Sequence, residues 1–236
     1  MLLPEGQVDQ QGIQAFQQLQ QQTPTDSDPI WNNFVHCIVS PLATAARDQT
    51  PVKEWDVKVF KADQTINAFA LPGGKIGVYS GILKVTKTDA QLAAVLAHEM
   101  SHVISRHGDE RVSQGLVAQL GMAAAQVSGA NPTVIGLLGM GAQVGVILPF
   151  SRAQETEADL VGLDLMARAG FDPRQSIDLW NNMKSASGGK APPAILSDHP
   201  SDDQRIQRLQ EHMGAAVAKY DQARAVGLAP HCALPK

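Results

Sequence analysis

The chain has 236 residues, of which 44% are hydrophobic and 18% charged, and its formal net charge is −4. A chain of this size and apolar content can bury one core, so one compact domain is predicted. The acidic balance, with no basic run that could follow phosphates, excludes nucleic acid as an expected partner.

The N-terminal region passes from residues 1–4 directly into a glutamine-rich stretch at 7–22, and no signal peptide precedes it. We expect that the protein is exported and that the start at Met1 stands in place of a removed leader peptide. A gene with nothing upstream of Met1 would argue against export. Ile13, Phe16 and Leu19 recur at helical spacing, so they predict a first helix.

A second helix is predicted over residues 30–47, interrupted at Pro41, because a proline ring disturbs the middle of a helix. Alternating apolar and polar residues predict a strand at 55–60. Residues 67–71 and 76–79 flank a Pro-Gly-Gly turn and predict two further strands. The three strands together predict a small sheet.

The five residues His98-Glu99-Met100-Ser101-His102 point to a chemistry. A helix puts residues four apart on one face, so both histidines can bind one metal ion while Glu99 turns toward a bound water. This is the pattern of a zinc-dependent hydrolase. Zinc would lower the pKa of the water from 15.7 toward about 7, and Glu99 would accept its proton.

The helix that carries this motif is predicted to begin at a capping box formed by Thr88 and Gln91 and to stop at Gly108. Its other face is apolar, so two histidines and a glutamate would be costly to bury there without a metal or hydrogen-bond partners. Core histidines with satisfied hydrogen bonds are the alternative interpretation. The apolar face consists of Leu92, Val95, Leu96 and Val103.

Residues 115–149 are apolar, rich in glycine and nearly uncharged. The break at 128–132 leaves runs of about 13 and 17 residues, both short of the roughly 20 that span hydrocarbon. A tightly packed helical hairpin is therefore the favoured interpretation. A lid or membrane-surface element is the second alternative, and a true span is the third.

A third metal ligand is required, because a catalytic zinc takes three protein groups and leaves the fourth position to water. A helix predicted to begin near Ser151 offers Glu155 and Asp159, four residues apart on one face. We predict Glu155 as the ligand and Asp159 as a hydrogen-bond partner of a ligand histidine. Glu157 is rotated away by about 200°, toward solvent or an arginine. Taken alone, this acidic cluster would be ordinary charge at a helix N-terminus.

The C-terminal part predicts a helix over 173–184, a glycine- and proline-rich loop over 185–193, and a last helix from about residue 202 that carries Ile206 and Leu209. His199 lies where the loop meets the last helix. A histidine at such a junction is usually a surface residue or a cap.

The motifs HEMSH at 98–102 and SRAQETEAD at 151–159 together resemble the M48 family of zinc metallopeptidases. The resemblance extends to residues 67–81 and 197–206, so it spans about 55–210. This family includes integral-membrane proteases and soluble or lipid-anchored envelope proteases of Gram-negative bacteria. The resemblance implies an α+β, predominantly helical fold of the zincin-like type, with the small sheet beside the HExxH helix.

The same resemblance assigns one zinc ion per chain to His98, His102 and Glu155, the base to Glu99 and a metal-supporting role to Asp159. His199 matches a family histidine that approaches the metal, either as a donor to the reacting oxyanion or as an inhibitory extra ligand. The chain 1–236 would then be one metallopeptidase domain. Its parts would be N-terminal helices (1–50), a catalytic core (51–210) and a C-terminal helix and tail (211–236).

Cys37 and Cys232 lie near opposite ends of a chain whose relatives commonly work in an oxidising compartment. A disulfide that ties the C-terminal tail to an early helix is therefore favoured. Two free buried thiols are the alternative. A second zinc site with the adjacent His36 and His231 is a third idea, which nothing else in the sequence supports.

The predicted function is a zinc-dependent endopeptidase for unfolded or misassembled envelope proteins, in the periplasm or cell envelope. The polypeptide substrate is expected to bind as an added strand. Ile76, Gly77 and Val78 are predicted on the docking edge, because Gly77 would let a backbone come close; a hairpin without substrate contact is the alternative. A proteolytically quiet, metal-loaded, chaperone-like binding protein of the envelope is the alternative function.

Overall fold

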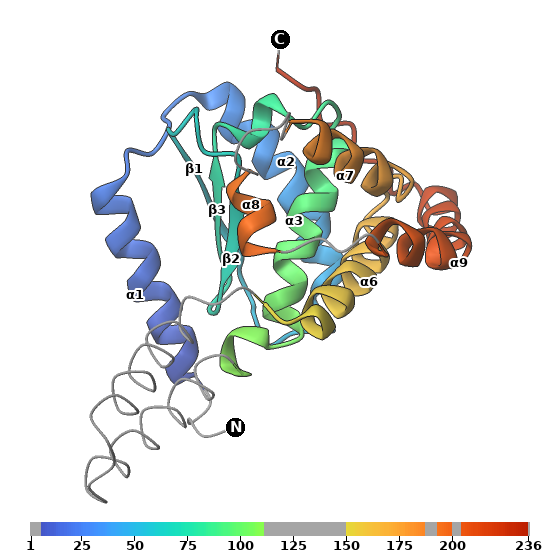
Figure 1. Ribbon diagram of the computed structural model, residues 1–236, viewed down its shortest axis with the longest axis horizontal. Helices are drawn as coiled ribbons and strands as arrows, with labels where there is room; N and C mark the ends of the chain where they lie inside the picture. Colours follow the sequence, from blue (N-terminus) through green and yellow to red (C-terminus); the bar gives the residue numbers. More distant parts are fainter. Residues whose placement is uncertain (1–5, 111–149, 187–192, 200–203, 236) are drawn as a thin grey trace, which may run out of the picture.

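The computed structural model describes residues 6–110, 150–186, 193–199 and 204–235. Their elements are helices gathered around one small sheet, so the predicted α+β, mainly helical fold class is confirmed (Figure 1). None of the described helices combines the length and the apolar character that crossing a bilayer requires. The segment 115–149, predicted as a hairpin, a lid or a span, lies outside the described residues.

The sheet contains the strands β1 (Asp56–Phe60), β2 (Ala68–Leu71) and β3 (Lys75–Tyr79), in the order β1-β3-β2. β1 runs parallel to β3, and β2 forms an antiparallel hairpin with it. The hairpin turn uses Gly73 and Gly74 at φ values of 80° and 73°, which residues with a Cβ rarely adopt. All three strands were predicted from their sequence pattern.

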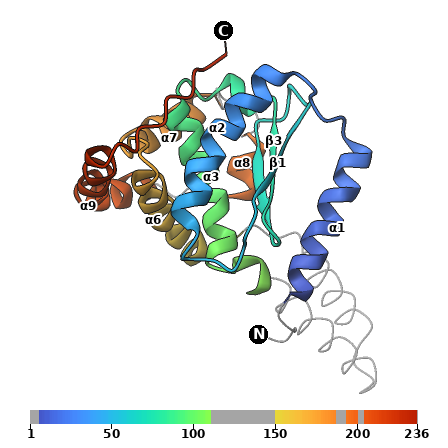
Figure 2. The ribbon, with the colours of Figure 1, turned by 180° about the vertical axis from the view of Figure 1, so that it is seen from behind.

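Helices cover both faces of the sheet. Figures 1 and 2 show α1 (Gln7–Gln22) on one face and α2 (Pro29–Ala46) with α3 (Asp89–Ile104) on the other. On the α1 side, the ring of Phe16 meets Phe60 edge to face, with 6.0 Å between the ring centroids.

The helix α2 runs through Pro41, so the predicted interruption is wrong. Proline lacks the N–H that would donate to the carbonyl of Cys37, yet the buried face of the helix holds it in place on both sides of that point. This buried face consists of Phe34, Val35, Ile38, Val39, Leu42 and Ala46.

The helix α3 lies at the centre of the molecule and is buried from Ala90 to Val103. Its N-cap is Thr88, whose Oγ1 accepts from the backbone N–H of Gln91 at 3.1 Å. The Gln91 side chain reaches back to the N–H of Lys87, one residue before the N-cap. The helix ends at Ile104 rather than at the predicted Gly108.

The helix α6 (Arg152–Arg168) crosses α3 closely. Its N-cap is Ser151, as the sequence predicts, and a capping box joins Ser151 to Gln154. Gly162 permits the close crossing, because a Cβ there would lie 3.0 Å from the backbone nitrogen of His98. The crossing therefore aligns the acidic face of α6 with the histidine face of α3.

The remaining elements of the described residues lie around this helix pair. They are the 3₁₀ turn η1 (Ile82–Lys84), α7 (Gln175–Ala186), α8 (Ala194–Asp198) and α9 (Arg205–Ala225). The short α8 was not predicted. It docks beside β2, where the Ile195 N–H donates to the carbonyl of Ile66 at 3.2 Å and the Asn67 side chain donates to Asp198 at 2.8 Å.

A disulfide joins Cys37 of α2 to Cys232 of the C-terminal tail, so the favoured pairing is confirmed. The idea of a second zinc site at these cysteines is wrong, because both sulfur atoms are consumed in the bond. The backbone N–H of Cys232 also donates to Asp89 in the first turn of α3. The tail is thereby held against the two helices that carry the core.

Candidate metal centre

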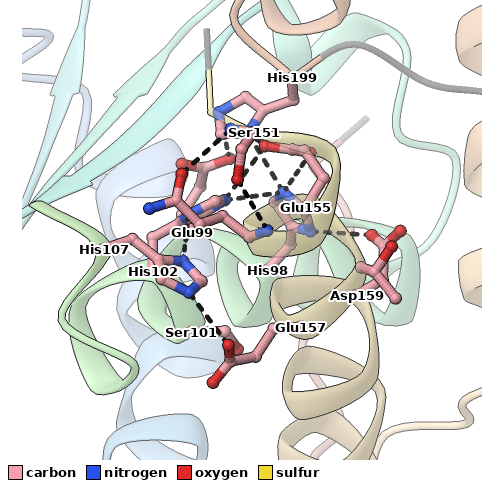
Figure 3. A network of polar contacts seen from close by, with 12 residues as sticks. His98, Glu99, Ser101, His102, His107, Ser151, Glu155, Glu157, Asp159 and His199 are labelled. Carbon is pink, nitrogen blue, oxygen red and sulfur yellow. Dashed lines mark hydrogen bonds and ion pairs between the residues drawn. The ribbon is translucent and has the colours of Figure 1, made fainter. Parts of the chain in front are cut away.

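Four potential metal ligands converge between α3, α6 and the end of α8 (Figure 3). His98 and His102 come from α3, Glu155 comes from the first turn of α6, and His199 follows the last turn of α8. One ligand atom from each residue lies within 4.8 Å of all the others, and all four residues are buried.

The ligand atoms are close enough to share one ion. Nε2 of His98 lies 3.2 Å from both Nε2 of His102 and Nδ1 of His199. The Glu155 carboxylate lies 2.8 Å from Nδ1 of His199 and 3.5 Å from Nε2 of each α3 histidine. Several ring nitrogens and a carboxylate therefore face the same point, which is the donor set that zinc prefers.

A charged network supports the His98 side of the cluster. Nδ1 of His98 lies 3.0 Å from Asp159, the partner that the sequence analysis assigned to a ligand histidine. Arg205, from the start of α9, donates through Nε to Asp159 at 2.6 Å and through Nη2 to Glu155. The same guanidinium carbon lies 4.0 Å from the ring centroid of Trp180.

A different group supports the His102 side. Nδ1 of His102 lies 2.9 Å from Nδ1 of His107, and Nε2 of His107 lies 3.4 Å from the carboxylate of Glu157. Glu157 faces away from the ligand cluster and toward solvent, as predicted, with 57% of its side chain exposed, and it also contacts His107. Phe150 stacks on the His102 ring with 3.8 Å between the centroids.

Glu99 is buried next to the ligands, and one of its oxygens lies 3.4 Å from Nε2 of His199. Burial raises the pKa of Glu99 above its ordinary value, against the opposing effect of the His199 and His98 charges. A buried carboxylate with a raised pKa beside a ligand cluster has the properties of a general base.

The electrostatics of the cluster favour a cation. Burial opposes a charge on His98, but hydrogen bonds with Asp159 and Glu155 raise its pKa to about 9. Burial also opposes the charge on Glu155, yet hydrogen bonds from His199 and His98 hold the pKa of this carboxyl well below its usual range. Burial and neighbouring histidine charges lower the pKa of His102, which keeps that ring neutral.

The buried charges around the cluster do not cancel. Glu99, Glu155 and Asp159 contribute three carboxylates, and Arg205 contributes one guanidinium. Metal binding requires neutral histidines, and in that state the difference is two negative charges, which a divalent cation would balance. The residues present therefore fit a zinc ion held by His98, His102 and Glu155.

Two residues at this site were missed by the sequence analysis as functional groups. Arg205 lies inside the stretch 197–206 of the family resemblance and His107 just before the predicted helix stop at Gly108, but neither was assigned a role. A charged residue among the apolar positions of its helix was the available signal for Arg205. His107 gave no such signal, because on a continuing helix it would lie about 140° around from His102.

The predicted docking edge is wrong. Ile76, Gly77 and Val78 lie in β3, which is the central strand and pairs with β1 on one side and β2 on the other. The small size of Gly77 serves packing, because a Cβ there would lie 2.2 Å from the Phe69 ring. The parallel pairing of β1 with β3 could not be read from local alternation.

The chain is similar in sequence to a known protein family and to several known proteases. Residues 29–213 match the family described as Peptidase family M48. The mitochondrial metalloendopeptidase OMA1 of Schizosaccharomyces pombe is 42% identical over 172 residues, which cover 71% of this chain and 49% of that protein. The OMA1 of Saccharomyces cerevisiae is 36% identical over 182 residues, covering 72% of this chain and 50% of that protein. The beta-barrel assembly-enhancing protease of Escherichia coli K12 is 30% identical over 212 residues, covering 85% and 42%. The chain thus spans half or less of these relatives.

Proposed function

The chain belongs to peptidase family M48, a family of metallopeptidases, and from this premise we propose that it is a zinc-dependent endopeptidase. The observation that carries the proposal is the convergence of two α3 histidines with Glu155, beside the buried Glu99. A binding protein has no need for a buried carboxylate next to the ligand atoms. The presence of Glu99 therefore favours an enzyme over the chaperone-like alternative.

In the proposed hydrolysis of a peptide, three residues bind the metal and a fourth transfers the proton. A zinc ion, when bound by His98, His102 and Glu155, would supply Lewis-acid polarisation and a water of lowered pKa. Glu99 accepts the proton of the attacking water and returns it to the leaving amine. Its burial keeps competing water away, and its raised pKa brings the carboxyl nearer to the pH at which a base works best.

His199 acts, in this proposal, as an inhibitory fourth ligand. Its Nδ1 atom lies 2.8 Å from Glu155 and 3.2 Å from Nε2 of His98, in the midst of the other ligands. Four protein ligands are typical of structural zinc sites, whereas catalytic sites keep one position open. His199 would therefore have to withdraw before water enters. We expect His199→Ala to raise turnover of a peptide, and a fall in turnover would instead favour the oxyanion role.

We propose that the substrate pairs with the edge strand β2, and not with the central strand β3. The Tyr79 N–H donates to the carbonyl of Asn67, so alternation along the hairpin turns the main-chain groups of Ala70 and the carbonyl of Ala68 toward the other side of β2. The N–H of Ala68 already donates to the Asn67 side chain at 2.9 Å. An extended peptide could pair there through main-chain hydrogen bonds. Ala70→Pro should raise the Michaelis constant for peptides, and unchanged kinetics in a folded variant would count against β2.

We further propose the cell envelope as the location and unfolded or misassembled envelope proteins as substrates. The disulfide between Cys37 and Cys232 supports an oxidising compartment. Docking through main-chain groups suits unfolded chains of any sequence. Among the relatives, one group is named as mitochondrial and another is named for enhancing β-barrel assembly.

The decisive experiment compares the zinc-loaded wild type with Glu99→Gln on unfolded casein. The variant should keep zinc and lose about 10²- to 10⁴-fold in cleavage rate, because it lacks the base. Glu211→Gln, an exposed glutamate on α9, is the matched control and should cleave normally. Normal cleavage by Glu99→Gln would refute the mechanism. Binding of casein without cleavage by either protein would favour the chaperone-like alternative.

A further inference from the structure

His107 is buried between a candidate ligand and the surface. Only 1% of the residue is exposed, and its two ring nitrogens face His102 on one side and Glu157 on the other (Figure 3). The Glu157 side chain is 57% exposed. A buried residue that served packing alone would be apolar, so the two polar contacts of this ring need an explanation.

A tight turn after α3 places His107 next to His102. The helix α3 ends at Ile104, and Arg106 adopts a positive φ of 58°, which costs a residue with a Cβ on the order of 1 kcal/mol. Arg106 donates through Nε to Asp109 at 2.7 Å, which closes the turn. This strained turn returns His107 to within 2.9 Å of the helix it has just left.

The contact decides which nitrogen of His102 carries a proton. A neutral imidazole has one N–H, and Nε2 of His102 faces the ligand atoms of His98 and Glu155. For Nε2 to offer a lone pair to a metal, the proton must lie on Nδ1, which then donates to Nδ1 of His107. The proton of His107 must in turn lie on Nε2, where it points to Glu157. The opposite arrangement would put a proton on the ligand atom itself.

We propose that His107 is a positioning residue that holds His102 in the Nδ1–H tautomer and in the orientation of a metal ligand. Glu157 fixes the tautomer of His107 from the outside. The inference rests on the proposed function, since it requires that His102 binds zinc. It adds a residue outside the ligand set on which the metal affinity depends.

The test measures the zinc dissociation constant by competition with a chromophoric chelator. His107→Phe keeps a ring of similar size but removes the acceptor, so the affinity should fall by about 10- to 100-fold. His107→Gln offers an oxygen acceptor and should lie closer to the wild type. Val39→Ala, a buried change in α2, is the control for general destabilisation and should leave the affinity unchanged.

The outcomes separate the inference from the proposed function. A wild type that binds no zinc overturns both. A wild type that binds zinc, with His107→Phe binding equally well, overturns the inference alone. If His107→Phe does not fold, ¹⁵N NMR of the zinc-bound wild type decides instead: the proposal requires a proton on Nδ1 of His102 and metal on Nε2, and the reverse assignment would disprove it.

Discussion

The two histidines of α3 have the same proposed role at the candidate metal centre but opposite surroundings. Their Nε2 atoms lie 3.2 Å apart, yet Nδ1 of His98 faces the buried carboxylate of Asp159, while Nδ1 of His102 faces another imidazole. Behind Asp159 stands the buried Arg205, whereas behind the second imidazole stands the exposed Glu157. We call Asp159 and Arg205 the charged support of His98, since both are buried ions. We call His107 and Glu157 the neutral support of His102, since its buried member is an imidazole and its carboxylate is exposed.

This difference should separate stability from metal affinity. Buried charges are costly to desolvate, so the charged support depends on each of its members being paired. The neutral support contains no buried ion, and losing a member leaves a dipole rather than a charge without a partner. We therefore expect damage to the His98 side to weaken the fold and the metal site together, and damage to the His102 side to weaken mainly the metal site.

The largest effect is expected for Arg205→Met. The variant leaves the carboxylates of Glu155 and Asp159 buried without their cation, so the free energy of unfolding should fall by about 3–5 kcal/mol in the metal-free protein. Urea denaturation measures it. Arg224→Met, an exposed position on the same helix, should change stability by less than about 0.5 kcal/mol. Equal losses in the two variants would mean that the buried guanidinium of Arg205 does not stabilise the charged support.

The second effect is expected for Asp159→Asn. The amide oxygen can still accept from Nδ1 of His98, but the negative charge is lost and Arg205 loses one of its two carboxylate partners. Zinc affinity should fall by about 10- to 100-fold. Asp164→Asn, on the same helix and paired outside the cluster with Arg168, is the control. If the affinity of Asp159→Asn matched that of the control, the charge behind His98 would have no part in metal binding.

The parts of this site that the sequence predicted are those set by local helical geometry. His98 and His102 share a face because they are four residues apart, and the same spacing joins Glu155 to Asp159. The start of α6 followed from the N-cap chemistry of Ser151. Each of these predictions needed only the residues within one or two turns.

The parts that were missed depend on contacts between distant segments. Arg205 reaches Asp159 across 46 residues of sequence, through the packing of α9 against α6. His107 is close to its helix neighbour only because Arg106 adopts a left-handed conformation that is rare for arginine. The central place of β3 likewise follows from its parallel pairing with β1, which local alternation does not specify. Tertiary packing and one strained residue thus carry the information that the local pattern lacks.

The smallest effect is expected for Glu157→Ala, and it tests the neutral side of the comparison most finely. The contact with His107 is long, at 3.4 Å, and the carboxylate is largely exposed, so water can accept from Nε2 in its place. Zinc affinity should fall by only about two- to threefold, the lower end of what one hydrogen bond contributes. The free energy of unfolding should change by less than about 0.5 kcal/mol, as for the exposed control Glu211→Ala.

A loss of affinity as large as that of His107→Phe would mean that the charge of Glu157 acts on the metal site through the imidazole. The His102 support would then be charged like its counterpart, and the contrast between the two histidines would lie only in burial.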